Sequence, residues 1–328
     1  FSLSTINLSE LRIQKKIPLR LLFIGLPLTM LLGILIAYPL FPEMNIWVLA
    51  LMALILSPTD AALGQAVVSS KEVPEEIRQS INVESGLNDG IALPPILICF
   101  AVLSTTGHAD AGFSYWMIFT LKQFIYGPII GGLIGWIGGI LVDKASEKGW
   151  MNHTFQSLSS ISMALMAFAL AESVHGNGFI AAYFAGLLLG THTKEVRARI
   201  HNFGEAESQA FVLFIFLIFG MVMIPLCMPY WNFNTWIYAL LSLTVIRMLP
   251  VALSLMGTKL PWQTVGFIGW FGPRGIATIL YTLLLVLELG SDGYEPMISV
   301  ITLTVTLSIF LHGITAVPFS KILGKSSI

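Results

Sequence analysis

Two carboxylates and one amide lie close together in a segment that is otherwise apolar. The segment reads ESGLNDGIALP (84–94) and carries Glu84, Asn88 and Asp89. Carboxylate, amide and hydroxyl oxygens are the ligands that hard cations prefer. A charged side chain in the middle of a bilayer costs about 2.5–3.5 kcal/mol or more, so such residues face one another or a water-filled cavity. If this segment crosses a membrane, it is a candidate site for a small cation.

Helical spacing sorts these side chains into two neighbouring stripes. Ser85 and Asp89 are four residues apart and share a face, while Glu84 and Asn88 form a second stripe about 100° away. The first stripe offers a hydroxyl and a carboxylate. In the second stripe, Glu84 can accept a salt bridge and Asn88 can supply an orienting amide.

Three further charges lie in the middle of apolar runs. Counting about 1.5 Å per helical residue from the ends of the runs places Asp60, Arg247 and Arg274 at the same depth as Asp89. With Glu84 included, three acids and two arginines leave one net negative charge, which one proton or one monovalent cation would neutralise. Because burial disfavours the charged form of a carboxylate, we expect the proton and the cation to compete for one place.

The composition indicates a polytopic membrane protein. Of 328 residues, 55% are hydrophobic and only 11% are charged, and the mean hydropathy is +0.82. A formal net charge of −1 gives no electrostatic reason to expect a nucleic-acid partner. No phosphate-binding loop and no His/Cys cluster indicates a nucleotide or metal cofactor, so none is expected.

Ten hydrophobic runs are long enough to cross about 30 Å of hydrocarbon as helices of about 20 residues. We expect an all-α protein with spans near 18–40, 45–69, 76–104, 113–142, 154–174, 177–191, 205–227, 232–256, 262–289 and 295–320.

The basic residues predict the orientation of these spans. Lys and Arg occur in alternate loops, at positions 12, 15, 16, 20, 71, 78, 144, 148, 194, 197, 199, 259, 321 and 325, and the intervening loops contain none. Basic loops face the cytoplasm in most membrane proteins. We therefore expect the basic loops and the C-terminus to be cytoplasmic, in a bacterial inner (plasma) membrane.

The ten spans divide into two groups of three and an intervening group. The second span is interrupted by SPTDA (57–61) and the ninth by FGPRGIA (271–277), so each trio has a broken middle helix. We expect 18–104 and 232–320 to be inverted repeats separated by the helices of 113–227. Paired broken helices of this kind form ion sites at the midplane of secondary transporters.

Residues 1–328 are expected to form one transmembrane domain. The sequence opens on Phe1 and a polar stretch with no signal-peptide pattern. We interpret this opening as an N-terminal truncation, with further spans missing.

SPTDA, ESGLND and FGPRGIA, in this order, resemble the signatures of the monovalent cation:proton antiporters of the NhaP and eukaryotic Na+/H+ exchanger branch. The resemblance covers nearly the whole chain. It implies the inverted-repeat, NhaA-like antiporter fold with two broken, crossing helices. It also implies that Asp89, preceded by Asn88, binds the ion, and that Ser85, Thr59 and Asp60 belong to the ion and proton site.

The resemblance further implies a supporting set of charges. Glu84 matches the family's buried acid, whose bridge partner is expected to be Arg247, and Arg274 matches the arginine of the second broken helix. Where the family usually has Pro after Thr-Asp, this chain has Ala61. The family also implies a homodimer whose interface uses the helices that we expect to be missing.

We therefore expect a secondary transporter, not an enzyme, that exchanges Na+ for H+ by alternating access without net charge movement. Its partners would be lipid, monovalent cations (Na+, with K+ or Li+ as alternatives) and protons. K+/H+ exchange stays open, because selectivity depends on cavity size and hydration. A cation channel would need a continuous pore. An intramembrane enzyme would need a paired nucleophile and base, which SGLNDG lacks.

Overall fold

The computed structural model describes residues 16–60, 62–104, 113–192 and 209–326, and within them the regular structure is entirely helical. Ala61, which departs from the family pattern, lies outside the described residues, and so do most of the polar opening and the basic loop around 194–199.

The described residues contain seven apolar helices of at least 18 residues that are long enough to cross a membrane, at Lys16–Leu40, Glu75–Leu103, Ser114–Glu147, His153–Ser173, Gln209–Tyr230, Phe233–Ser254 and Glu295–Gly324. Three shorter apolar helices lie at Ile46–Ile55, Gly178–Leu189 and Ile276–Leu289. These ten helices fall where the ten spans are predicted. Two of the three short ones belong to the spans that the sequence predicts to be broken.

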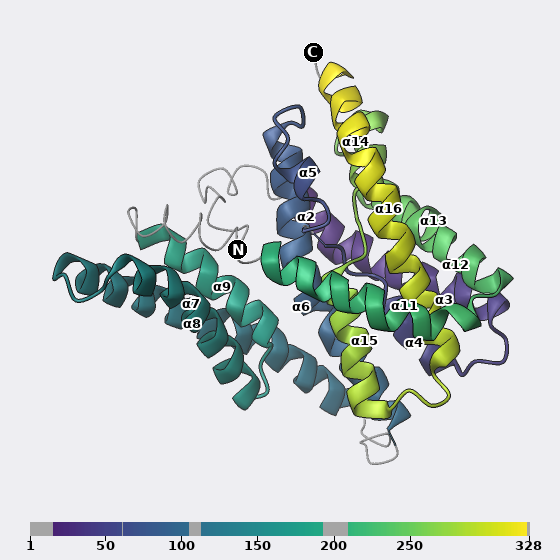
Figure 1. The fold of residues 1–328 in the computed structure, drawn as a ribbon, viewed down its shortest axis with the longest axis horizontal. Helices are drawn as coiled ribbons and strands as arrows, with labels where there is room; N and C mark the ends of the chain where they lie inside the picture. The colour runs from purple at the N-terminus through teal and green to yellow at the C-terminus, as the bar shows by residue number, and fades with distance from the viewer. Residues whose placement is uncertain (1–15, 61, 105–112, 193–208, 327–328) are drawn as a thin grey trace. The chain divides into compact units, whose positions relative to one another are not determined.

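One compact unit contains α7 (Phe113–Glu147), α8 (His153–Ser173) and α9 (Gly178–His192), which pack on one another as long helices (Figure 1). Small side chains make this packing close. Ala167 and Ala171 of α8 form a buried cluster with Ala181 and Ala185 of α9. Small residues allow helix backbones to approach within a membrane, where no hydrophobic force drives helices together.

The second unit contains the remaining described helices from residue 14 to 109 and from 214 to 328. In chain order they are α2 (Lys16–Arg20), π-helix η2 (Leu21–Gly25), α3 (Leu26–Leu40), α4 (Ile46–Ile55), α5 (Gln65–Val68), α6 (Glu75–Leu103), η3 (Phe219–Met223), α11 (Ile224–Cys227), η4 (Met228–Tyr230), α12 (Phe233–Leu243), α13 (Val245–Ser254), α14 (Trp262–Trp270), α15 (Ile276–Leu289) and α16 (Glu295–Ser326). Every candidate site residue belongs to this unit.

Two helical runs of this unit are interrupted at candidate site residues, Asp60 in one and Arg274 in the other. The helical run of α4 ends at Ile55 and resumes at Gln65, and that of α14 ends at Trp270 and resumes at Ile276. The intervening segments contain Pro58 in one case and the sequence GPRG in the other, which cannot continue a helix without strain or lost hydrogen bonds. Each predicted trio thus has a broken middle helix, while the inverted relation between the trios stays a prediction.

Candidate functional site

The two interrupted helices contact each other through their unwound segments. The N–H of Asp60 donates to the carbonyl of Pro273 at 2.8 Å, and the Thr278 hydroxyl donates to the carbonyl of Ile55 at 3.2 Å. The first bond joins main-chain groups freed by the two breaks, and in the second a side chain of α15 satisfies the carbonyl at the end of α4. This pairing explains how irregular backbone is tolerated away from water.

Asp60 caps the N-terminus of α15 from the other broken helix. Its Oδ2 accepts a hydrogen bond of 2.7 Å from the N–H of Ile276, and its Oδ1 accepts one of 2.8 Å from the N–H of Ala62. A helix N-terminus carries unsatisfied N–H groups and a partial positive charge, so a carboxylate is stabilised there. Both oxygens of Asp60 are thus engaged by the protein, and its predicted part in ion binding would be shared with this structural one.

Arg274 is the positively charged residue at the point where the two broken helices cross. It is fully buried, and its Nη1 donates to the carbonyls of Gly272 at 3.0 Å and Pro58 at 3.5 Å. Its main-chain N–H donates to the Ser308 hydroxyl at 2.8 Å. The guanidinium therefore places positive charge just beyond the C-terminal ends of α4 and α14, where helix dipoles favour cations.

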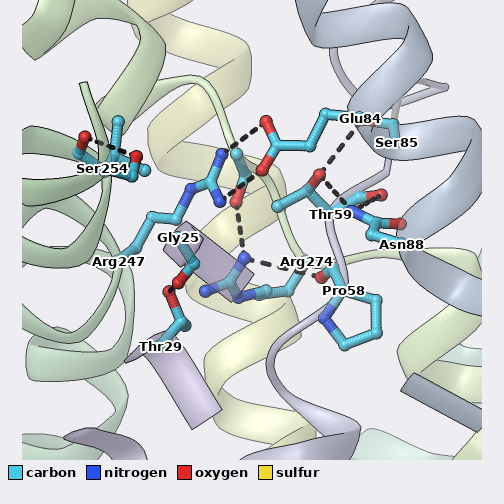
Figure 2. Close-up of polar contacts among 12 residues, drawn as sticks. Gly25, Thr29, Pro58, Thr59, Glu84, Ser85, Asn88, Arg247, Ser254 and Arg274 are labelled. Atoms are coloured by element: carbon cyan, nitrogen blue, oxygen red, sulfur yellow. Dashed lines mark hydrogen bonds and ion pairs between the residues drawn. The ribbon is translucent and has the colours of Figure 1, made fainter. Parts of the chain in front are cut away.

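The predicted buried ion pair is present in the structure. Arg247 of α13 donates to Glu84 of α6 through two parallel bonds, Nη1 to Oε1 at 2.6 Å and Nη2 to Oε2 at 2.9 Å (Figure 2). Each side chain is only 1% exposed. Two-pronged Arg–carboxylate pairs are strong and directional, so this pair fixes α6 against α13.

The hydroxyl of Thr59 joins two side chains of α6. It lies 3.1 Å from the Ser85 hydroxyl and accepts a hydrogen bond of 2.7 Å from Asn88 Nδ2, as Figure 2 shows. Asn88 Nδ2 also lies 3.4 Å from the Thr59 carbonyl. The amide of Asn88 therefore orients the first break, and it contacts the same partner as Ser85 although helical spacing places it on the stripe of Glu84.

Asp89 continues this polar cluster along α6. Its carboxylate atom Oδ1 is buried without a hydrogen-bond partner among the described residues, and Oδ1 of the neighbouring Asn88 is in the same state. Buried polar atoms in folded proteins nearly always have a partner, so unpartnered oxygens here indicate a place for a donor or a cation. Asp89 directly follows Asn88, whose amide contacts the Thr59 hydroxyl, and carboxylate, amide and hydroxyl oxygens are ligands suited to a hard monovalent cation. The predicted roles of these residues stay predictions.

Sequence reasoning missed an aromatic residue that contacts Asp89. The Tyr281 hydroxyl, on α15, donates to the Asp89 carbonyl at 2.7 Å. This bond ties the candidate ion-binding helix to the second broken helix. The signal in the sequence was the run of polar side chains Thr278, Tyr281 and Thr282 on the buried face of α15.

Sequence reasoning also missed a support beneath Arg274. The hydroxyl of Ser308 that accepts from Arg274 lies 3.2 Å from His312 Nδ1, and His312 Nε2 lies 2.8 Å from the carbonyl of Trp270. His312 also stacks on Trp270 with ring centroids 5.1 Å apart. Ser308 and His312 are four residues apart in an apolar helix, which was the available clue.

Two crossing interrupted helices around buried carboxylates define a class of protein, the secondary transporters. The family model described as sodium/hydrogen exchanger, transmembrane, matches residues 4–322, and the chain belongs to this family. It is a family of transporters, not of enzymes, and the chain is an integral membrane protein.

A solved structure supports the fold assignment. The sodium proton antiporter MjNhaP1 from Methanocaldococcus jannaschii at pH 8 matches with a TM-score of 0.73 and 20% identity, over 98% of this chain and 81% of that one. The predicted NhaA-like antiporter fold is thus confirmed.

Some relatives are named as Na+/H+ antiporters and others as K+/H+ antiporters. A Na+/H+ antiporter of Schizosaccharomyces pombe is 26% identical over 282 residues, which are 80% of this chain and 58% of the relative. A K+/H+ antiporter, NhaP2, of Shewanella oneidensis is 25% identical over 268 residues, which are 80% of this chain and 45% of the relative. The chain spans about half the length of these relatives.

Proposed function

We propose that this chain exchanges a monovalent cation, Na+, for H+ across the membrane by alternating access, with Asp89 as the shared binding group. The observation that carries the proposal is the unpartnered Oδ1 of Asp89, which continues the hydroxyl and amide cluster of Thr59, Ser85 and Asn88 at the helix crossing. Family membership supports the class of transport.

The arrangement gives each group a separate task. Asp89 carries either a proton or a cation, because two positive species cannot occupy one carboxylate at low dielectric. The hydroxyls of Thr59 and Ser85 replace part of the water shell of the cation, and Asn88 holds Thr59 in position. Asp60 and Arg274 hold the broken helices together while the bundle moves. No cofactor other than the transported ions takes part.

K+/H+ exchange is the second candidate. Relatives named for Na+ and for K+ match with similar identity, 26% and 25%. The same oxygen ligands serve both ions, and selection between them depends on the size and hydration of the cavity. We propose Na+ as the transported cation, and a transport assay with each ion in turn distinguishes the two candidates.

Proteoliposomes with an imposed pH gradient provide that assay. Addition of Na+ should dissipate the gradient in the unaltered protein, and Li+ and K+ added in turn give the selectivity. Asp89→Asn keeps the shape of the side chain and removes its charge, so it should abolish cation-driven proton movement. Asp292→Asn, at an exposed position, is the matched control and should exchange normally. Normal exchange by Asp89→Asn would overturn the proposal.

The basic loops are proposed to face the cytoplasm of a bacterial inner membrane, and the protein to act as a homodimer. The charge pattern of the loops supports the orientation. Single cysteines placed at Lys259 and at Asp292 should react with an impermeant thiol reagent from opposite sides of the membrane. Labelling of both from one side would refute the orientation.

A further inference from the structure

An apolar groove lies between α13 and α14, separate from the transport site. It has a volume of about 690 Å³, and α13 contributes Met248, Leu249 and Ala252, while Leu260, Val265 and Gly266 line the other side. Gly266 supplies no side chain, and an added Cβ there would meet nothing within 4 Å. The groove is therefore open beside Gly266 and mainly apolar along its lining, as an acyl chain requires.

One end of the groove is basic. Lys259 lines it from the loop between the two helices and is exposed. Arg20 lies against the same end, because its Nη1 donates to the carbonyl of the lining residue Met256 at 2.6 Å. Trp262, also in the lining, is 79% exposed. Exposed Trp and Lys side chains are typical of the boundary between lipid and water.

The backbone at Lys259 is unusual for a lysine. Its φ is +62°, in the left-handed region that Gly or Asn normally occupies at a turn. A side chain other than Gly in this region is under strain of order 1–3 kcal/mol, and such strain is concentrated at functional positions. A glycine would fit this turn more easily, so the presence of lysine here indicates a use for its charge.

We propose that this groove binds an anionic glycerophospholipid, with one acyl chain between α13 and α14 and the headgroup phosphate at Lys259 and Arg20. The apolar lining matches the acyl chain of such a lipid, and the basic end matches its headgroup phosphate. A lipid without net charge would leave the positive charges of Lys259 and Arg20 uncompensated. A soluble anion would leave the apolar lining unused. The inference does not depend on the proposed ion exchange.

Native mass spectrometry of the detergent-purified protein tests this site by direct counting of bound lipid. The probes are phosphatidylglycerol, phosphatidylcholine and inorganic phosphate, each titrated separately. Lys259→Gln removes the charge, and Gly266→Phe fills the groove. The matched controls are Lys321→Gln, at another exposed lysine, and Gly313→Phe, where an added Cβ also meets nothing within 4 Å. Thermal unfolding without lipid establishes that each variant is folded.

We expect one phosphatidylglycerol to bind more tightly than phosphatidylcholine. Lys259→Gln should weaken this binding about fivefold, because one basic residue near an anionic headgroup contributes about 1 kcal/mol. Gly266→Phe should weaken it about tenfold or more, equivalent to two buried CH₂ groups at about 0.8 kcal/mol each. Both control variants should bind as the unaltered protein does.

Four results would overturn the proposal. The first is equal binding of the two lipids, which would indicate ordinary annular lipid. The second is retention of inorganic phosphate alone with the same dependence on Lys259, which would indicate an anion site without an acyl chain. The third is unchanged lipid binding in folded Lys259→Gln and Gly266→Phe. A change of dimer mass with Gly266→Phe, in place of lipid loss, would assign the groove to a second copy of the chain.

Discussion

The carboxylate of Asp60 accepts a hydrogen bond of 2.7 Å from the N–H of Ile276, so the first broken helix caps the second. A capping residue is normally the neighbour of the helix in sequence. Here it lies 216 residues away. The partial positive charge at the N-terminus of α15 is therefore compensated by Asp60 only while the two helices cross.

We predict that Asp60→Ala lowers stability more than Asp60→Asn. Asparagine keeps one oxygen acceptor for the N–H of Ile276 and loses the charge, whereas alanine loses both. Loss of a helix cap costs about 1 kcal/mol, and the lost charge at the helix end adds to it. Thermal unfolding in detergent measures the difference. Equal stability of the two variants would show that Asp60 does not act as a cap.

The second prediction concerns the close approach at Gly275. A Cβ built at this position would collide with the carboxylate of Asp60. We expect Gly275→Ala to displace Asp60 from α15 and to reduce exchange sharply in the proteoliposome assay.

Gly220→Ala and Gly313→Ala are the controls for this prediction, because an added Cβ meets nothing within 4 Å at either position. Both should retain exchange and stability. If Gly275→Ala transports as well as these two variants, the tight contact between the broken helices is not required for the cycle.

The third prediction ranks two acids of α6 by stability. Breaking one partner of a buried pair costs about 3–5 kcal/mol, because the other charge is left unpaired in low dielectric. Glu84→Gln should therefore lower the unfolding temperature more than Asp89→Asn does. The reverse order would identify Glu84 as the group that exchanges its proton.

A double substitution measures the interaction between Glu84 and Arg247 apart from the contacts that each makes with other residues. Glu84→Gln combined with Arg247→Met removes both charges and should recover part of the stability that Glu84→Gln loses, since contacting residues are not additive. Full additivity of the two losses would mean that the two bonds between these side chains contribute nothing.

The helices and their interruptions could be predicted from the sequence because they depend on local signals. A run of about 20 apolar residues predicts a span, and Pro58 and FGPRGIA mark the breaks. The pairing of Glu84 with Arg247 has no local signal, because 163 positions separate them. Only the resemblance to a family predicted it.

The engagement of Asp60 and Asn88 could not be predicted in this way. Helical spacing gives the face on which a side chain lies but not the segment that crosses it. Asn88 shares a stripe with Glu84 by spacing, yet its amide contacts Thr59, because the unwound segment of the first break runs past that position. Arg274 likewise contacts carbonyls that become free only when both helices are broken.

The last prediction is that exchange is electroneutral, one cation for one proton. Of the three acids at the helix crossing, Glu84 is neutralised by Arg247, and Asp60 is held by the main-chain N–H groups of Ile276 and Ala62. Asp89 is the acid whose Oδ1 has no partner among the described residues. One carboxylate that alternates between one proton and one monovalent cation has the same net charge on both half-cycles, so the membrane voltage does no net work.

In an electrogenic cycle, a membrane voltage of 100 mV would do work of about 2.3 kcal/mol on each net charge moved. This work would change the equilibrium Na+ gradient about fiftyfold. Proteoliposomes held at zero voltage and at about −100 mV with a potassium ionophore, with Na+ as the test ion, distinguish the two cases. The Na+ gradient at which net proton flux stops should equal the H+ gradient and should not move with voltage. A shift with voltage would refute one-for-one exchange. It would require a second acid to release its proton during transport, and Asp60 is then the candidate, because the Glu84–Arg247 pair would have to separate first.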